Sequence, residues 1–256
     1  MLDLHASALA AIALLGCLTT LWLLSLALRD SSIVDIFWGP AFGLIAWVSV
    51  AAHGPAGPRA LLAAGLTTLW GLRLGAYLFW RNHRRPEDPR YTAMRRRHGE
   101  SWWWKSYLIV FVLQGALAWV VSLPVQAAVA SAGPLGLLDA AAAAVVLFGV
   151  GFESLGDLQL ARFKASPEGK GALMTRGLWS WTRHPNYFGD FTTWWGLGLL
   201  GVAAGAPWTL LGPAVMAFLL MRVSGVPLLE KAMRGRPGYD DYVARTSAFF
   251  PRPPRR

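Results

Sequence analysis

Long apolar runs with almost no charge dominate this chain of 256 residues. A helix needs about 20 such residues to cross the hydrocarbon core of a bilayer. Runs such as LLDAAAAAVVLFGVG are apolar on every face, unlike the alternating strands of a membrane barrel. The expected fold is therefore all-α, an integral membrane bundle of about seven transmembrane helices. These are predicted over residues 7–28, 33–53, 59–80, 106–128, 134–156, 188–205 and 207–228.

Composition agrees with a surface that faces lipid. Hydrophobic side chains make up 55% of the chain and charged ones only 15%, which is a poor match to a water-soluble domain. The single cysteine, Cys17, excludes a disulfide framework and a cysteine-based metal site, and we expect no metal.

Basic residues predict the orientation of the helices. Lys and Arg gather in residues 81–105, 162–183 and 231–256, whereas the loops near 129–133 and 205–207 have none. Basic loops stay in the cytoplasm, so we expect an outside N-terminus and a cytoplasmic C-terminus in a multi-pass protein, as in the bacterial inner membrane. The formal net charge of +10 then requires no nucleic-acid partner, and it favours contact with anionic membrane lipids.

Ionisable side chains inside apolar helices are costly and are therefore candidates for function. Asp35 begins the second run, where a helix-dipole role and a functional role are both open, because Trp38 and a Gly-Pro pair follow at once. Arg73 lies two turns inside the third run, which favours an internal partner or an anionic ligand. Glu153 and Asp157 are four apart and share one helical face, so their mutual repulsion calls for donors from a ligand or from arginines.

The segment GLWSWTRHPNYFGDFTTWWG, residues 177–196, is the most informative part of the sequence. It combines cationic donors, an amide, aromatic faces and an acid, a mixture that suits a large, polar, partly aromatic and anionic ligand. An interfacial aromatic belt would explain its tryptophans but not the RHPNY element. The candidate ligand-binding residues here are Arg183, His184, Asn186, Tyr187, Asp190 and Trp194.

At these residues the sequence resembles the C-terminal part of the steroid 5α-reductases and their bacterial membrane relatives, and more distantly the sterol reductases, which carry a similar RHxNYxGD element. The likeness covers residues 152–251 well and includes the terminal GYDDYVARTSAFFP. A bacterial branch of this family is similar nearly end to end, through SIVDIFWGP, WGLRLGAYLFWR, EDPRY and LLEK-x5-RPGYDDY.

The resemblance implies a single membrane domain over residues 1–256 that binds NADPH. Residues 1–128 would form the substrate side and residues 129–256 the cofactor-binding part. By position, Glu153 and Asp157 match the family's pair at the adenine and ribose end. The other residues implied at the cofactor are Arg73, Tyr77, Lys164, Lys170, Arg183, His184, Asn186, Tyr187, Asp190, Trp194 and Tyr242.

The reaction implied is hydride transfer from NADPH to a carbon–carbon double bond conjugated with a carbonyl. The family's catalytic carboxylate lies on the second helix, where Asp35 is the counterpart, and a carboxyl group in a dry site can act as a proton donor. The tyrosine that partners this acid in the family falls at Trp70, so either the acid works alone or the substrate is not a steroid enone. Trp38 and Trp70 would line the site of a lipid-soluble substrate.

Two other classes of function stay open at the level of sequence. Isoprenylcysteine and phospholipid methyltransferases bind S-adenosylmethionine through a similar RHPxYxG element. Against them, Asp190 follows Gly189 as in reductases, and Glu230 stands alone where those methyltransferases carry paired glutamates. A transporter or lipid-binding scaffold would need inverted repeats or matching broken helices, which the sequence lacks. Nothing in the sequence predicts an oligomeric state.

Overall fold

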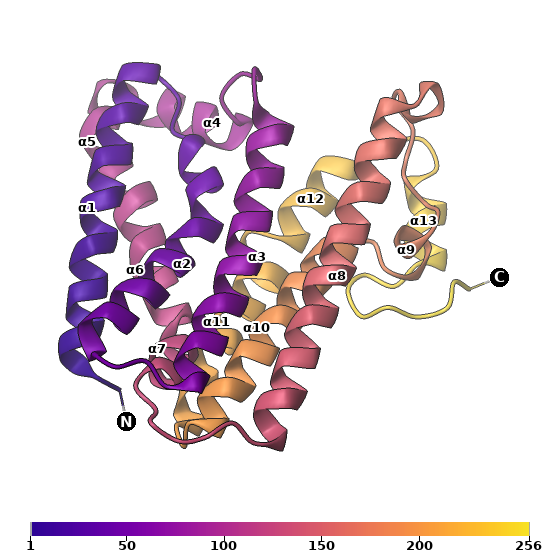
Figure 1. The fold of residues 1–256 in the computed structure, drawn as a ribbon. Helices are drawn as coiled ribbons and strands as arrows, with labels where there is room; N and C mark the ends of the chain where they lie inside the picture. Colours follow the sequence, from indigo (N-terminus) through magenta and orange to yellow (C-terminus); the bar gives the residue numbers. More distant parts are fainter. Residues whose placement is uncertain (1, 256) are drawn as a thin grey trace. The chain divides into compact units, whose positions relative to one another are not determined.

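The structure is a computed structural model that describes residues 2–255, and within this range it is helical (Figure 1). The long helices are α1 (Leu4–Leu28), α2 (Ile33–His53), α3 (Pro58–Asn82), α8 (Leu137–Ala165) and α10 (Pro185–Ala203). The short ones are α4 (Pro89–His98), α5 (Trp102–Ser106), α6 (Leu113–Val121), α7 (Leu123–Val129), α9 (Leu178–Trp181), α11 (Leu211–Phe218), α12 (Val226–Met233) and α13 (Tyr239–Arg245). Single turns of 3-10 helix lie at Gly99–Ser101, Pro167–Gly169 and Pro207–Leu210, and π-helical turns at Tyr107–Val112 and Leu219–Val223.

Six of the described segments are long and apolar enough to cross a membrane: Leu4–Leu28, Ile33–His53, Pro58–Asn82, Pro89–Val121, Leu137–Ala165 and Pro207–Met233. They overlap six of the seven predicted runs, which confirms an all-α, multi-pass integral membrane protein surrounded by membrane lipid. The seventh run, 188–205, falls in α10. That helix has 19 residues but is not among the six, because Asn186, Asp190 and two threonines reduce its hydropathy.

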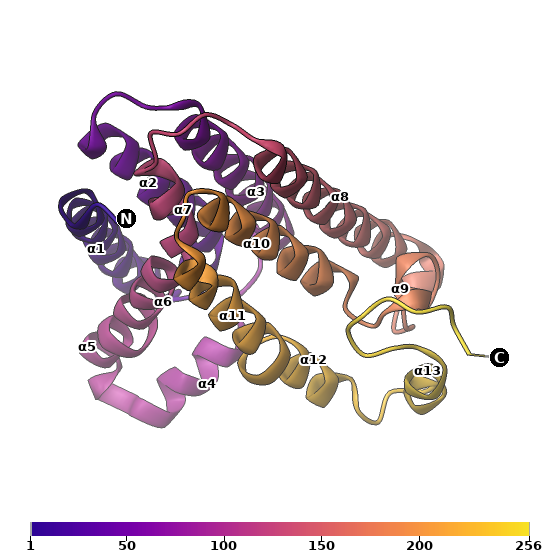
Figure 2. The ribbon, with the colours of Figure 1, turned by 90° about the horizontal axis from the view of Figure 1, so that it is seen from below.

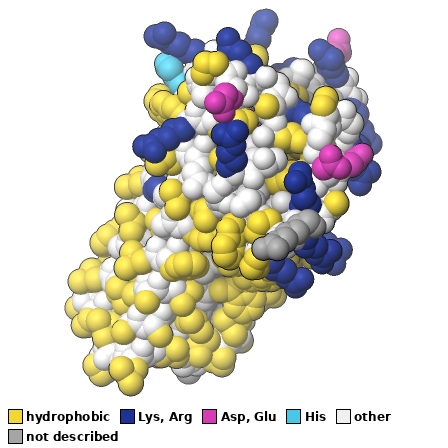
Figure 3. All heavy atoms as spheres, turned by 90° about the vertical axis from the view of Figure 1, so that its right-hand side faces the viewer, with side chains coloured by type: hydrophobic (Ala, Val, Ile, Leu, Met, Phe, Trp, Pro, Cys, Tyr) yellow, Lys and Arg dark blue, Asp and Glu magenta, His cyan; other side chains and the backbone are white. Residues whose placement is uncertain are grey.

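The chain divides into two compact units, which are described separately. The first contains the described residues up to Ala140 together with Leu197–Gly212, and the second contains Ala141–Gly196 and the residues from Pro213 onward. On the face drawn in Figure 3, Lys and Arg side chains gather at one end and hydrophobic side chains cover the other. This separation is the one expected of a surface that passes from a membrane interface into lipid.

In the first unit, α2 and α3 approach closely through small residues. A Cβ at Gly39 or Gly71 would meet the backbone of the other glycine, and a Cβ at Gly75 would meet the ring of Pro40. Pro40 lies inside α2, where it removes a backbone donor, and the glycines of α3 accept its ring. Small residues are the usual way for membrane helices to pack backbone to backbone.

In the second unit, α8 and the first part of α10 lie side by side (Figure 2). A Cβ at Gly149 would meet the backbone of Thr193, and a Cβ at Gly189 would meet the backbone and side chain of Glu153. Glu153 therefore faces α10. The helix predicted to end near residue 156 continues to Ala165, so Asp157 lies within regular helix as well.

Candidate active site

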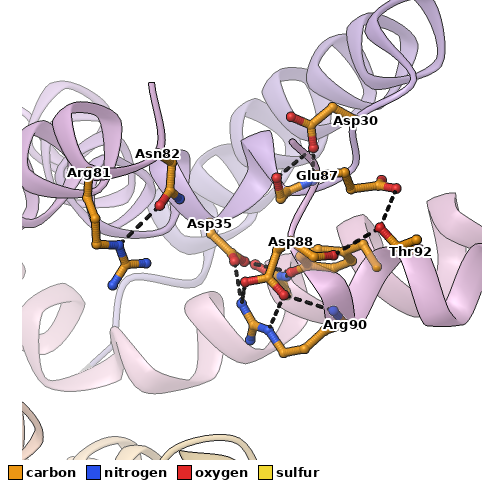
Figure 4. A network of polar contacts seen from close by, with 11 residues as sticks. Asp30, Asp35, Arg81, Asn82, Glu87, Asp88, Arg90 and Thr92 are labelled. Carbon is orange, nitrogen blue, oxygen red and sulfur yellow. Dashed lines mark hydrogen bonds and ion pairs between the residues drawn. The ribbon is translucent and has the colours of Figure 1, made fainter. Parts of the chain in front are cut away.

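Asp35, in the first turn of α2, is the centre of a polar cluster in the first unit (Figure 4). Its Oδ1 accepts a hydrogen bond from the Tyr91 hydroxyl at 2.6 Å, and its Oδ2 accepts one from Nη2 of Arg90 at 2.7 Å. Arg90 also donates to both carboxylate oxygens of Asp88, at 2.9 and 3.2 Å. Two carboxylates thus share one guanidinium, which leaves one negative charge uncompensated among the three groups.

The start of α4 holds Arg90 and Tyr91 in place. Asp88 caps this helix by accepting from the backbone N–H of Arg90, and Pro89 occupies the first helical position, where proline is favoured. Glu87 links this turn to the start of α2, since its Oε1 accepts from the Ser31 N–H at 2.7 Å and from Arg95 at 2.8 Å. Burial raises the pKa of Glu87, but the bonds from Arg95 and Ser31 outweigh it, so the pKa lies below its usual value.

A shallow apolar groove of about 10 Å³ lies beside this cluster in the first unit, between α1, α2 and α6. Its lining includes Trp38 from α2 and a single amide side chain, Gln114 from α6. Nε2 of Gln114 donates to the Tyr91 hydroxyl at 3.1 Å. A chain of hydrogen bonds therefore runs from the groove through Gln114 and Tyr91 to Asp35.

The two tryptophans predicted at the substrate have different surroundings. Trp38 is half-buried at the groove, with its ring edge-on to Phe42 at 5.2 Å between centroids. Trp70, on α3, is fully buried and packs edge-on against the same phenylalanine, with 5.5 Å between ring centroids. The residue next to the Asp35 carboxylate is therefore Tyr91, and Trp70 packs in the core of the unit.

In the second unit, the RHPN turn before α10 is held by a glutamate and by the C-terminal segment. Oε1 of Glu230 accepts from Nε and Nη2 of Arg183 at 2.8 and 2.6 Å and lies 3.3 Å from Nε2 of His184. Nη1 of Arg183 donates to the Thr246 carbonyl at 2.6 Å. Thr182 lies in extended backbone, pairs with Ser247 and donates to the Phe249 carbonyl. Pro185 then starts α10 at the position where a missing N–H costs nothing.

Two polar atoms of this turn are buried without a hydrogen-bond partner among the described residues: Nδ1 of His184 and Oδ1 of Asn186. The His184 ring stacks on Tyr187, with 5.6 Å between centroids and 11° between planes. Burial, with the charge of Arg183, lowers the pKa of His184 below its ordinary value against the opposing effect of Glu230. A buried polar group left unpaired costs about 1–3 kcal/mol, so these atoms favour a bound polar ligand.

The other predicted cofactor residues of α8 and α10 are mostly buried. Glu153 and Asp157 are 3% and 4% exposed, and Asp190 and Trp194 are 8% and 0% exposed. Each of these four has an interaction with the rest of the protein. Burying polar side chains in apolar helices is costly, and apolar packing alone gives no reason for it. These four buried side chains on two adjacent helices are therefore candidates for function.

The remaining predicted residues are more scattered. Arg73 and Tyr77 are half-buried on α3, with the Arg73 guanidinium 6.0 Å from the Tyr77 ring centroid. Lys164, at the end of α8, and Lys170, in the loop beyond it, are exposed. The Tyr242 hydroxyl donates to the Trp179 carbonyl at 2.6 Å, and burial raises the pKa of Tyr242.

Sequence reasoning missed Arg90, Tyr91, Gln114 and the role of Glu230. Arg90 and Tyr91 belong to the EDPRY segment, which at the level of sequence is only a mark of the family resemblance. Tyr91 and Asp35 are 56 positions apart, and Glu230 and Arg183 are 47 apart. The acid-rich EDPRY segment, next to a basic stretch, was the signal that could have pointed to a polar cluster.

Comparison with known proteins shows the family. The chain belongs to the family described as "Protein of unknown function (DUF1295)", whose profile matches residues 21–246. It is also similar to the nickel-cobalt-cadmium resistance protein NccN of Alcaligenes xylosoxydans xylosoxydans, with 34% identity over 116 residues. That match covers 45% of this chain and 52% of the relative, so the chain spans about half the length of the curated relative it matches. No solved structure gives a significant match.

The name of this relative refers to resistance to metals. Among residues 2–255, no three His, Cys, Asp or Glu side chains lie grouped so that they could hold a metal ion.

Proposed function

We propose that the protein is a membrane-embedded reductase that uses NADPH to reduce the conjugated double bond of a lipid-like or steroid-like enone. The proposal extends the sequence resemblance to the steroid 5α-reductases. The observation that carries it is the 2.6 Å contact between the Tyr91 hydroxyl and the Asp35 carboxylate, next to an apolar groove. Reduction of an enone needs a proton donor at the carbonyl oxygen, whereas methyl transfer to a nucleophile does not.

The second unit provides residues that fit a dinucleotide. The buried Nδ1 of His184 and Oδ1 of Asn186 have no partner among the described residues, and a ligand with amide, hydroxyl and ring nitrogen groups would satisfy both. Glu153 and Asp157 would accept from ribose hydroxyls, and Lys164 and Lys170 would approach phosphates. NADPH, when bound, supplies the hydride.

The first unit provides the proton. As an enone accepts a hydride at its β-carbon, negative charge develops on the carbonyl oxygen. Tyr91 and Asp35 hold a proton between oxygens that are 2.6 Å apart, and that proton passes to the carbonyl oxygen. Water then protonates the α-carbon of the enol while the oxygen-bound proton returns to the Tyr91–Asp35 pair, so the one proton consumed comes from solvent. Gln114 keeps the phenol oriented, and the apolar part of the substrate would pack against the residues that line the groove.

The ligand that copurifies with the protein tests the proposal. The protein is purified in mild detergent, denatured, and its released small molecules are analysed by absorbance and mass. We expect a nicotinamide dinucleotide in the wild type and much less of it in an Asn186→Ala variant. Release of S-adenosylmethionine or S-adenosylhomocysteine would instead identify the methyltransferase class and overturn the reductase proposal.

A further inference from the structure

The C-terminal segment that follows α13 folds back on the second unit (Figures 1 and 2). The backbone N–H of Arg252 donates to the Trp181 carbonyl at 3.0 Å, and the N–H of Arg255 donates to the Arg245 carbonyl at 3.0 Å. The N–H of Arg183 donates to the Ser247 carbonyl at 2.9 Å. Main-chain bonds thus bring together arginines that are far apart along the chain.

This segment borders an open pocket of about 280 Å³ at the surface. Four arginines line it, namely Arg183, Arg245, Arg252 and Arg255, and no acidic residue does. The charge of Arg183 is offset by Glu230 at 2.6 Å. The other three guanidiniums have no ion pair with an acid among the described residues, although Nε of Arg245 donates to the Asp241 carbonyl at 3.3 Å; Ser247 is a neutral polar residue of the lining.

Three uncompensated positive charges around one cavity repel each other, and the repulsion is relieved when an anion enters. A phosphate group has several acceptor oxygens that match the planar forks of guanidinium groups. We propose that this pocket, formed by Arg245, Arg252, Arg255 and Ser247, is a binding site for a phosphate group. The site does not depend on the proposed reduction, because these four residues lie outside the set assigned to NADPH. Arg183, the lining residue that does belong to that set, is paired with Glu230 and is not part of the proposed site.

Orientation in the membrane explains why basic residues lie in this part of the chain, but it does not explain the pocket. Exposed arginines on a free tail would spread apart, whereas here Pro253 and Pro254 stiffen the segment and hydrogen bonds fix its path. A preformed concave site loses less entropy on binding than a flexible tail does. The phosphate could belong to an anionic lipid head group or to a soluble phosphate compound.

The test uses the full chain in nanodiscs and compares the two sources. In discs of phosphatidylcholine alone, calorimetry measures binding of inorganic pyrophosphate. In discs that also contain phosphatidylglycerol, native mass spectrometry counts the phosphatidylglycerol molecules retained after the disc is removed. The pocket variant is Arg245→Gln with Arg252→Gln and Arg255→Gln. The matched control removes three exposed charges outside the pocket, through Lys231→Gln, Arg234→Gln and Arg236→Gln.

We expect the pocket variant to lose about tenfold or more in pyrophosphate affinity, or to lose its retained phosphatidylglycerol, while the control matches the wild type. The first result identifies a soluble phosphate and the second a lipid head group. Equal loss in the pocket variant and the control, or no loss in either assay, would overturn the proposal. If the triple variant does not fold, Arg252→Gln alone keeps the backbone bond to Trp181, and it should show a smaller loss in the same assay.

Discussion

The Asp35 cluster is half-buried and the RHPN turn is largely buried, and the two polar regions also differ in how completely their own chain satisfies them. Both oxygens of Asp35 accept a hydrogen bond from neighbours in the same unit. In the RHPN turn, Arg183 is fully engaged by Glu230 and by backbone carbonyls, yet Nδ1 of His184 and Oδ1 of Asn186 remain unpaired among the described residues. The first region is thus satisfied by its own neighbours, whereas the second leaves two buried polar atoms unpaired, and these are the atoms that the proposal assigns to a ligand.

Replacing Asp35 should have the largest effect on turnover. Asp35→Asn keeps the shape of the side chain but cannot release a proton, so we expect NADPH affinity near wild type and turnover reduced by about 10²-fold or more. Single-turnover oxidation of bound NADPH with a reducible enone measures this. Asp88→Asn is the matched control, because it removes the other carboxylate on Arg90 and leaves a competent helix cap. A wild-type rate for Asp35→Asn would remove this carboxylate from the mechanism.

Asn186→Ala should affect binding and spare the fold. The change removes a carbonyl oxygen that has no partner within the described chain, so the bundle should stay as stable as the wild type. Loss of a hydrogen bond to the cofactor should weaken NADPH binding by about 1–3 kcal/mol. Fluorescence titration and a thermal melt measure the two quantities. Thr192→Ala, which removes a hydroxyl bonded within α10, is the control and should keep its affinity. Unchanged affinity in Asn186→Ala would place the cofactor elsewhere.

Tyr91→Phe tests which member of the acid pair carries the proton. Loss of the hydroxyl leaves Asp35 with Arg90 but without its closest donor, so we expect turnover to fall by about tenfold, with NADPH affinity unchanged. Tyr107→Phe removes a hydroxyl that pairs with Thr19 in the same unit and should behave as wild type. If Tyr91→Phe lowers turnover more than Asp35→Asn does, the phenol alone is the proton donor.

The smallest expected effect is a pH dependence from His184. The pKa of His184 is lowered in the fold, so its ring binds a proton less readily than it does in the unfolded chain, where a histidine has a pKa of about 6.5. The stability that neutral His184 contributes is therefore present above that pH and declines as the pH falls below it. Thermal midpoints at about pH 7.5 and about pH 5.5 should differ less in His184→Asn than in the wild type. Exposed His83→Asn should follow the wild type, and parallel pH profiles for His184→Asn and wild type would contradict the prediction.

The sequence was sufficient to predict the helices because a bilayer imposes a strong rule on length and polarity. The run predicted at 33–53 coincides with α2, and the run at 59–80 lies within α3. The prediction was less accurate where polar residues continue a helix, since α8 extends to Ala165 through Glu153 and Asp157. Hydropathy marks where a helix leaves the apolar pattern and not where its hydrogen bonds end.

Prediction of the site was limited by sequence separation. Motif spacing brought His184, Asn186 and Asp190 together because they lie within two helical turns. The partners that complete each cluster, Tyr91 for Asp35 and Glu230 for Arg183, come from distant segments. Only the packing of the chain places them, so no local pattern could have predicted these contacts.

The most direct test of the central claim is a set of equilibrium titrations of the detergent-purified protein with NADPH, NADH and S-adenosylmethionine. The proposal predicts saturable binding of NADPH, at least about tenfold weaker binding of NADH, and no saturable binding of S-adenosylmethionine. The preference for NADPH is expected because Arg73, Lys164 and Lys170 supply more cationic donors than a pyrophosphate alone requires. Tight binding of S-adenosylmethionine without binding of NADPH would contradict the reductase assignment.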